Sequence, residues 1–346
     1  MKKKKYFGSG FSRITEIICS DLKKEYDFEF KDFTSTYCGL IKSRNFLKKK
    51  YKTKEIYDYD VVHLGTWEVI ISFKKVRKDQ LFIAHAHGFF VGINFDATIR
   101  EIPFVKRQIS KALKFFLDNK MKNKLREADM FYVSTPNMLE HAKKIRSDAL
   151  WLPNPIDVKN FNPNGKKAKL EGNPSVFFPT RFHAFKNPLY GVNIFNKILE
   201  KYPEAKLHIV NYGGAPDPLR VEFKFKLLKK GTYIEHKMMP HDKLAEFYRG
   251  ADLVLGQFND NLGNLSLVEL EAMASGAPIV TLDKYERDMP LDKCEEIAFK
   301  IIEDKKFKSK FIKDNLDYVR RVHSDEAVAK LHKKNLHNLI KKTKFS

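Results

Sequence analysis

Two cationic side chains lie five positions apart, directly after an apolar segment in the second half of the sequence. The segment Val176–Pro179 is short and apolar, as a buried strand would be, and Arg181 and Lys186 follow it. Ligands of parallel sheets bind at the carboxyl ends of strands, where an arginine fork and a lysine ammonium group can hold one anion from two sides. The pair predicts a diphosphate site. The alternative is a surface pair without a ligand, because the chain carries 65 lysines and arginines.

A second candidate site begins at Ser266, which precedes an apolar run. Ser266, with Glu269 three positions later, has the form of a capping box and predicts that a helix begins there. The amides of Ser266, Leu267 and Val268 would then be available to phosphate oxygens at the positive end of the helix dipole. Glu271 lies among apolar residues and needs a partner, because a buried unpaired charge is costly. The hydroxyl groups of a ribose would supply one.

Glycines after the first apolar segment indicate a ligand-binding loop in the first half of the chain. Gly8, Ser9, Gly10 and Phe11 connect the first expected strand to the first expected helix. Glycine lets backbone amides approach a ligand closely, because it has no Cβ. A plain tight turn is the alternative.

Three histidines fall at the ends of two consecutive expected strands. His85 and His87 alternate and therefore share a face, and His63 ends the preceding strand. All three could line one site, although packing in the core explains His63 equally well. A His-x-His pair can be half of a metal site, but no further Cys, His or Asp cluster in the sequence completes it. We therefore expect no metal.

Short apolar segments alternate with amphipathic helices along the chain, which is typical of parallel α/β sheets. The expected strands are 4–7, 28–33, 61–64, 81–85, 130–134 and 150–152, then 176–179, 206–210, 233–237, 253–257 and 279–282. A polar stretch rich in proline and glycine separates the two series. We predict an N-terminal Rossmann-like domain over 1–155, a linker over 156–172 and a C-terminal Rossmann-like domain over 173–320. A final helix over 321–346 could dock on either domain, and we expect it to pack back on the first.

The net charge of +22 points to nucleic acid, to an anionic membrane surface, or to no partner at all. No RNA-recognition, zinc-finger or basic-zipper signature is present, so we expect no nucleic-acid partner. The stretch 99–126 mixes lysines and arginines with apolar and aromatic residues, which predicts contact with an anionic membrane surface. The alternative is a helix that packs on a sheet.

The sequence has no run of apolar residues long enough for a membrane span, and its basic start is not followed by an apolar segment. Its 3 cysteines are isolated, which suits a reducing compartment. We therefore expect a cytoplasmic protein, peripheral on the inner membrane face.

The segments around Arg181 and Glu271 resemble the nucleotide-sugar half of glycosyltransferase family 4. Arg181 and Lys186 take the places of that family's diphosphate-binding pair, and Glu271, in LEAMASGAPIV, takes the place of the glutamate that holds the ribose. Weaker matches extend the resemblance over most of the chain: Asp60–His63, Ala86–Gly88, Leu152–Asp157 and Gly213–Pro216.

The resemblance implies the GT-B fold, an α/β architecture in which two Rossmann-like domains face each other across a cleft. It implies a metal-independent retaining transfer of a hexose-type sugar from a UDP- or GDP-sugar to a hydroxyl group. The acceptor would be a glycan or a lipid-linked molecule at the cytoplasmic membrane face, and no cofactor besides the donor is expected. The implied catalytic residues are His87, Arg181 and Lys186. The implied donor-binding residues are Gly8, Gly10, Arg181, Lys186, Gly213, Gly263, Asn264, Ser266, Leu267, Val268 and Glu271. The implied acceptor side comprises Ser9, Phe11, His63 and His85.

One position departs from the family pattern. The family carries another glutamate eight residues before Glu271, beside the transferred sugar, and this chain has Gly263 there. We infer altered recognition of the donor sugar, through Asp260, Asn261 or Asn264. The alternatives are another GT-B activity, such as a nucleotide-sugar epimerase or a phosphorylase, and a catalytically weak sugar-nucleotide-binding subunit.

Overall fold

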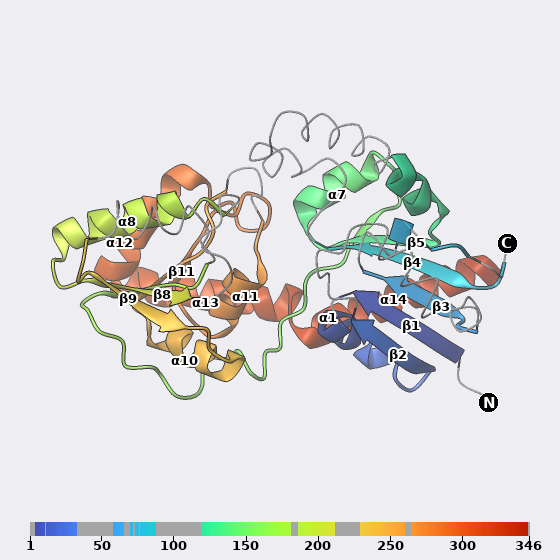
Figure 1. The fold of residues 1–346 in the computed structure, drawn as a ribbon, viewed down its shortest axis with the longest axis horizontal. Coiled ribbons are helices and arrows are strands. Elements are labelled where there is room, and N and C mark those ends of the chain that lie inside the picture. The colour runs from blue at the N-terminus through green and yellow to red at the C-terminus, as the bar shows by residue number, and fades with distance from the viewer. Residues whose placement is uncertain are drawn as a thin grey trace. The chain divides into compact units, whose positions relative to one another are not determined.

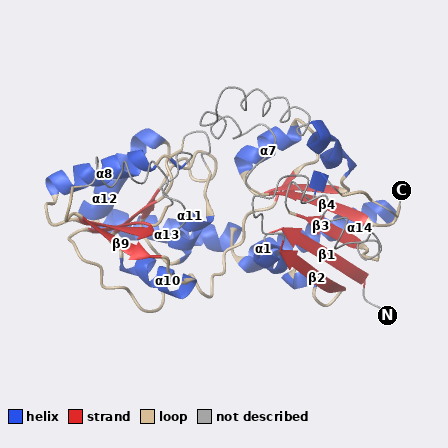
Figure 2. Ribbon diagram, in the orientation of Figure 1, coloured by secondary structure: helices blue, strands red, loops and turns tan. Residues whose placement is uncertain are grey.

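The computed structural model describes residues 4–10, 12–32, 58–65, 70–71, 73–75, 77–87, 119–180, 186–211, 229–259 and 264–344. The chain divides into two compact units. Unit 1 comprises Met1–Pro155 with Asp325–Ser346, and unit 2 comprises Ile156–Ser324. Each unit contains one parallel sheet with helices packed on it (Figures 1 and 2). The α/β class expected from the sequence is confirmed.

The sheet of unit 1 has parallel strands in the order β2-β1-β3-β4-β5-β6. Its strands are β1 (Lys4–Gly10), β2 (Tyr26–Asp32), β3 (Val61–Leu64), β4 (Leu81–Ala86), β5 (Met130–Val133) and β6 (Leu150–Trp151). Each lies where the sequence predicts a strand. The chain runs from β1 to β2 on one side and then crosses to the other side for β3, so the winding direction reverses between β1 and β3.

Side chains alternate across this sheet, so each face carries its own core. The helices of unit 1 are α1 (Ser12–Ile18), the short 3-10 helix η1 (Ser20–Leu22), a helix over 119–127, α7 (Pro136–Lys143) and α14 (Asp325–Lys344). Val62 and Phe82 pack on the face that α7 covers. Val61 and Ile83, one position earlier and later, pack on the opposite face with residues of α1 and α14.

The C-terminal helix α14 belongs to unit 1, where it lies against α1 and η1 (Figure 1). Glu25 accepts hydrogen bonds from Lys333 at 2.9 Å and from His337 at 2.7 Å. Burial raises the pKa of Glu25, but these two bonds outweigh it and lower the pKa overall. The chain returns to unit 1 at Asp325, so residues 321–324, expected in the final helix, stay in unit 2.

The sheet of unit 2 has parallel strands in the order β11-β10-β7-β8-β9. Its strands are β7 (Ser175–Phe178), β8 (Lys206–Asn211), β9 (Tyr233–Lys237), β10 (Leu253–Leu255) and β11 (Ile279–Val280). Its helices are α8 (Pro188–Lys201), α10 (His241–Gly250), α11 (Leu267–Ala274), α12 (Leu291–Glu303) and α13 (Lys305–Val322). Within the described ranges, no helix of either unit combines the length and the apolar character needed to cross a membrane.

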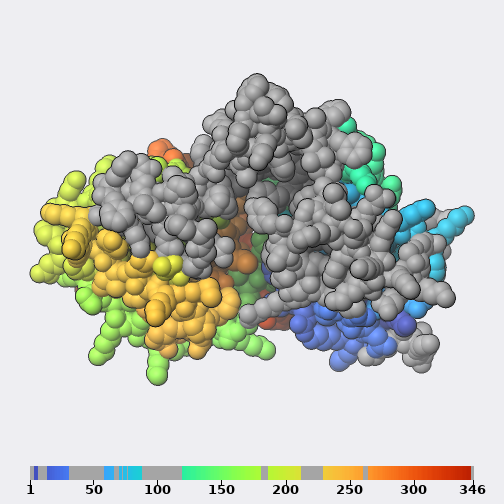
Figure 3. Space-filling model, in the orientation of Figure 1, coloured from blue at the N-terminus to red at the C-terminus, as the bar shows by residue number. Residues whose placement is uncertain are grey.

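The stretch 156–172, expected as a linker, packs on unit 2 instead. Arg249 of α10 donates to the backbone oxygens of Asn162 and Lys166 at 3.0 and 2.8 Å, and Phe161 is buried in the core of unit 2. The stretch and α10 lie side by side on the surface (Figure 3). The segment is therefore held to unit 2 by the Arg249 hydrogen bonds and by the buried Phe161 ring.

Candidate functional site

The candidate site of unit 2 lies where its strand order reverses. β7 leads to β8 and β9 on one side, and the chain then returns to the other side of β7 for β10. α/β sheets bind ligands at the carboxyl ends of the strands that flank such a reversal. Lys186 follows β7, as the sequence predicts, and Gln257 follows β10.

Lys186 is held at the end of β10 by a neutral side chain. Its Nζ donates to Oε1 of Gln257 at 2.6 Å, and the backbone N–H of Phe258 donates to the Lys186 oxygen at 3.1 Å. Burial lowers the pKa of Lys186, and the nearby Glu269 opposes that effect. An amide partner orients the ammonium group without neutralising its charge.

Gln257 also joins Lys186 to the start of α11. Its Nε2 donates to the backbone oxygen of Asn264, and its backbone N–H donates to Oε1 of Glu269 at 3.0 Å. Gln257 is buried and was assigned no role from the sequence. The available signal was an amide side chain at the end of an apolar strand, beside the loop that carries the predicted anion site.

Helix α11 begins at the predicted capping box, which is confirmed. The backbone N–H of Ser266 donates to Oε2 of Glu269 at 2.6 Å, and Ser266 Oγ donates to the same oxygen. The expectation that the Ser266 amide is available to phosphate is therefore wrong, because Glu269 occupies it. Leu267 and Val268 carry first-turn amides, which a helix cannot satisfy internally, at the positive end of the dipole.

A side chain at position 256 would collide with Thr281 and with the buried carboxylate of Glu269, so a glycine is needed there. A Cβ at this position would lie 2.6 Å from the Thr281 side chain and 2.9 Å from Oε1 of Glu269. Thr281 in turn donates from Oγ1 to the Gln257 oxygen at 2.9 Å. The end of β10 is thus fixed from both sides, and so is Gln257.

Glu271 lies on α11 and is 8% exposed. The sequence left it without a protein partner, but the structure supplies two neighbours from α10. Tyr248 donates from its hydroxyl group to Oε2 at 3.4 Å, and Nδ1 of His241 lies 3.8 Å from Oε1. The Glu271 carboxylate therefore has partners within the protein, and both of these come from α10.

Thr180, at the end of β7, is a polar residue that the sequence analysis missed. It is 3% exposed, and its Oγ1 has no hydrogen-bond partner within the part of the chain that the structure describes. A buried hydroxyl group without a partner is costly. It lies at the switch point, next to the segment that contains Arg181.

Several predicted site residues lie outside the described residues. These are Phe11, Arg181, Gly213, Asp260, Asn261 and Gly263. Their assigned roles stay predictions.

The glycines of unit 1 lie in a strand, not in the predicted loop. β1 continues through Gly10, and Gly8 and Ser9 pair with His63 and Leu64 of β3. The loop prediction is wrong for these residues because the strand is paired on both sides, with β2 and with β3. β1 ends at Gly10, beside the reversal of strand order between β1 and β3.

The rings of His85 and His87 lie together, with centroids 3.7 Å apart, as their alternation predicts, and the ring of His63 stacks on His85 at 5.4 Å. His63 and His85 are completely buried, which supports the core-packing alternative that the sequence left open for His63. His87 follows β4, is partly buried, and has its Nδ1 2.8 Å from Ser134 Oγ. Burial lowers the pKa of His87 to about 4, so its imidazole is neutral at pH 7.

The structure also brings together a group of metal-ligand types that the sequence did not suggest. Single ligand atoms of Cys19, His63 and His332 all lie within 4.8 Å of one another. The hydroxyl group of Tyr6 lies 2.9 Å from His63 Nδ1 and 3.1 Å from His332 Nε2. Burial raises the pKa of the Cys19 thiol to about 12, and the Tyr6 hydroxyl group joins the two histidines by hydrogen bonds.

Comparison with known proteins gives matches in sequence and in fold. Residues 161–287 match the family model described as glycosyl transferases group 1. A D-inositol 3-phosphate glycosyltransferase of Corynebacterium efficiens is 27% identical over 111 residues. That match spans 30% of this chain and 26% of the relative, so about a quarter of the relative is covered.

Solved structures match over nearly the whole chain. Sucrose-phosphate synthase from Thermosynechococcus elongatus superimposes with a TM-score of 0.70 at 13% identity, covering 99% of this chain and 100% of that one. Anabaena HepE, solved with UDP and glucose, superimposes with a TM-score of 0.64 at 11% identity, covering 97% and 100%. With the two parallel sheets, these matches show that the chain has the GT-B fold.

Proposed function

We propose that this protein is a retaining glycosyltransferase of family 4. It transfers a hexose-type sugar from a UDP- or GDP-sugar to a hydroxyl group of a glycan or lipid-linked acceptor, without a metal. The observation that carries the proposal is the arrangement of Lys186, Gln257 and the start of α11. This arrangement falls within the residues that match the glycosyl transferases group 1 model.

The chemistry follows from where negative charge grows. When the bond between sugar and phosphate breaks, the leaving diphosphate gains charge, and fixed positive groups stabilise it more than they stabilise the intact donor. Lys186 is oriented before the donor arrives, and the amides of Leu267 and Val268 supply the positive end of α11. Arg181 would add a second cation. An acceptor hydroxyl group that attacks on the same face as the leaving phosphate gives retention.

Glu271 and Thr180 fit the remainder of such a donor. Glu271 is a nearly buried carboxylate on α11, and its two oxygens can accept hydrogen bonds from the two ribose hydroxyl groups. The buried Oγ1 of Thr180 would find its partner in a donor oxygen at the switch point.

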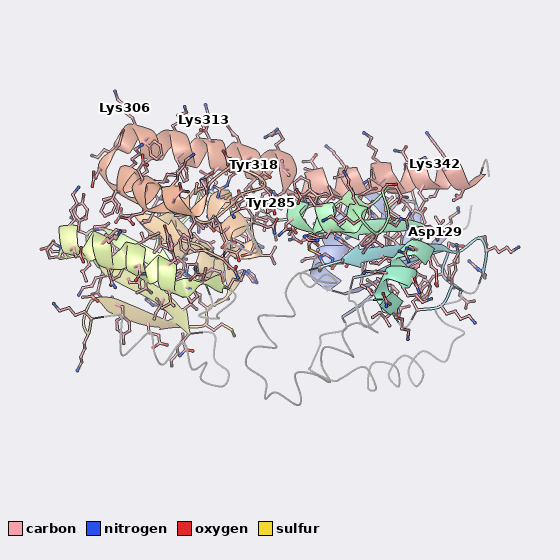
Figure 4. The ribbon with its side chains drawn as sticks, turned by 90° about the horizontal axis from the view of Figure 1, so that it is seen from above. Asp129, Tyr285, Lys306, Lys313, Tyr318 and Lys342 are labelled. Carbon is pink, nitrogen blue, oxygen red and sulfur yellow. The ribbon has the colours of Figure 1, made fainter. Side chains whose placement is uncertain are left out.

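The proposal of a membrane-borne acceptor rests on the positive charge of the protein. The net charge is +22, and Lys306 and Lys313 of α13 point away from unit 2 (Figure 4). The predicted docking stretch 99–126 is described only from residue 119. Met121 and Leu125 pack into the core of unit 1. This end of the stretch is therefore a helix that packs on the sheet, which was the alternative to membrane contact.

The decisive experiment is a thermal-shift screen against UDP-, GDP- and ADP-sugars, followed by turnover with the stabilising donor. A donor at 100 times its Kd should stabilise the protein by about 2.7 kcal/mol. Product NMR should show the donor's anomeric configuration, and EDTA should leave turnover unchanged. Release of free nucleotide and an epimerised sugar without an acceptor would identify an epimerase, and a requirement for inorganic phosphate a phosphorylase. Binding without turnover would identify a binding subunit.

A further inference from the structure

Four buried side chains of unit 1 present the atom types that bind zinc. Cys19, His63 and His332 each offer one ligand atom, and these three atoms lie within 4.8 Å of one another. The hydroxyl group of Tyr6 lies beside them, 2.9 Å from Nδ1 of His63 and 3.1 Å from Nε2 of His332. A hydrogen bond also joins it to the Cys19 side chain. One sulfur, two imidazole nitrogens and one oxygen make a ligand set for a tetrahedral zinc ion.

None of the four side chains reaches solvent. Tyr6, Cys19, His63 and His332 are all 0% exposed, and the first two belong to a core cluster of otherwise apolar residues. Polar groups are costly in such a core unless they are paired. Either hydrogen bonds among the four groups or one shared metal ion meets that need.

The spacing of the four groups suits ligands of a single ion. With bonds of about 2.0–2.1 Å to nitrogen or oxygen, two ligand atoms of a tetrahedral zinc site lie about 3.3 Å apart. The two distances from the Tyr6 oxygen, 2.9 and 3.1 Å, are already close to that value. The other pairs lie within 4.8 Å, so zinc has to draw each of them together by at most about 1.5 Å.

The far nitrogen of each histidine ring is held by another residue. Nε2 of His63 lies 3.3 Å from Nδ1 of His85, and Nδ1 of His332 lies 3.2 Å from the hydroxyl group of Tyr132. Histidines that bind a metal almost always use their second ring nitrogen in such a hydrogen bond, which orients the ring toward the ion. Both rings therefore have the surroundings of metal ligands.

We propose that unit 1 holds one structural zinc ion, bound by the side chains of Tyr6, Cys19, His63 and His332. The ligands come from β1, from the residue that follows α1, from β3 and from α14. The ion fastens the C-terminal helix α14 to the sheet. All four coordination positions are filled by the protein, so the ion has none for a substrate and takes no part in the proposed sugar transfer.

Binding of zinc releases two protons. Zn2+ displaces the hydrogen of the Cys19 thiol and that of the Tyr6 hydroxyl group, and the resulting thiolate and phenolate cancel its two positive charges in the apolar core. Without a metal, burial raises the pKa of Cys19 to about 12 and that of Tyr6 well above its usual range. A coordinated cation reverses this effect, because the ligands of a metal bind in their deprotonated form.

Cobalt binding tests the site directly, because Co2+ replaces Zn2+ in tetrahedral sites and absorbs visible light. Untagged protein, freed of metal with a strong chelator, should bind one Co2+ per chain. Its spectrum should show a near-ultraviolet sulfur-to-cobalt band and the intense visible bands of a tetrahedral ion, and Zn2+ should abolish both. If saturating Co2+ produces no sulfur-to-cobalt band, the proposal is overturned.

Cysteine variants identify the sulfur ligand. Cys19→Ser should lose the sulfur-to-cobalt band. Cys294→Ser is the matched control and should keep it, because Cys294 is also a buried free cysteine but lies on α12 of unit 2. A band that survives in Cys19→Ser, or that disappears in Cys294→Ser, overturns the assignment.

Proton release tests the oxygen ligand. Calorimetric titration with Zn2+ in buffers of different ionisation enthalpy should report two protons released per zinc in the wild type and one in Tyr6→Phe. Two protons from Tyr6→Phe would remove Tyr6 from the ligand set and overturn the four-ligand site.

Thermal melting tests the link to α14. Zinc at 100 times its Kd should raise the melting temperature of the wild type by about 5–10 °C, and His332→Gln should lose that rise. His337→Gln should keep it, because His337 lies on the same helix but pairs with Glu25. A rise in His332→Gln as large as in the wild type overturns the proposal. None of these measurements uses a sugar donor, so their outcome is independent of the proposed function.

Discussion

Nζ of Lys186 lies 2.6 Å from Oε1 of Gln257, so an uncharged amide orients the cation of the candidate donor site. Gln257→Ala should therefore weaken nucleotide-sugar binding while removing no charge. It also leaves buried polar partners unsatisfied, which should cost about 1–3 kcal/mol of stability. Thermal melts with and without the donor measure both effects. Gln80→Ala is the matched control, because Gln80 is buried and donates to the Tyr59 backbone oxygen at 3.0 Å in unit 1. A donor shift that is unchanged in Gln257→Ala contradicts the prediction.

Lys186 should act mainly on the transition state, because the charge of the diphosphate grows as the sugar leaves. Lys186→Met should lower kcat by about a hundredfold or more and change donor affinity less. Lys197→Met, on the exposed side of α8 with Glu295 as its partner, should leave both unchanged. Steady-state kinetics would contradict this role if Lys186→Met raised only the donor KM.

Substitution of Glu269 should lower the stability of the protein, whereas substitution of Glu271 should weaken nucleotide binding. Glu269→Gln disturbs the capping box and the bond to Gln257, so it should lower the free energy of unfolding by about 1–2 kcal/mol. Glu271→Gln should keep the melting temperature and weaken nucleotide binding, because the two ribose hydroxyl groups lose a charged acceptor. Calorimetric titration with UDP and GDP checks the second point. Equal affinities for the wild type and Glu271→Gln would exclude a ribose contact.

The buried histidines should make unit 1 sensitive to acid. The pKa of His87 is about 4 and that of His332 about 3, against about 6.5 in an unfolded chain. Between these values the unfolded state binds more protons, so the free energy of unfolding falls as pH falls. The loss is on the order of 1 kcal/mol per pH unit for each such histidine.

Melting temperatures from pH 8 to pH 5 test this, with variants that separate the two units. Burial also lowers the pKa of His208 and His236 in unit 2, so the wild-type slope contains both units. His332→Gln should flatten the slope. His337→Gln, on the same helix but with a partly exposed ring, should not. Identical pH slopes for the two variants would show that the buried His332 is not a cause of the acid sensitivity.

The membrane proposal predicts that the protein binds to anionic vesicles and that high salt abolishes this binding. Each lysine or arginine near such a surface contributes about 1 kcal/mol, and screening removes that contribution at high salt. Flotation with anionic and neutral vesicles at low and high salt measures it, and Lys306→Glu with Lys313→Glu should reduce binding. Recovery in the unbound fraction under every condition refutes docking and favours a soluble acceptor.

Local patterns in the sequence determined the elements of this protein and part of its donor site. A strand such as Val61–Leu64 is visible because apolar length and composition are local properties. The start of α11 is visible for the same reason, since Ser266 and Glu269 lie within one helical turn. The position of Lys186 after β7 also follows from chain order alone.

Only the tertiary structure decided which side chains meet. Alternation tells that His85 and His87 share a face, but not that α14 returns to unit 1 and brings His332 to Tyr6, 326 positions away in the chain. The role of Gln257 could not be predicted for the same reason. Its partner Lys186 lies 71 positions away in the chain and meets it only because β10 pairs with β7. Hydrogen bonds depend on distances of a few tenths of an ångström, and the order of strands in a sheet fixes those distances whereas periodicity along the chain does not.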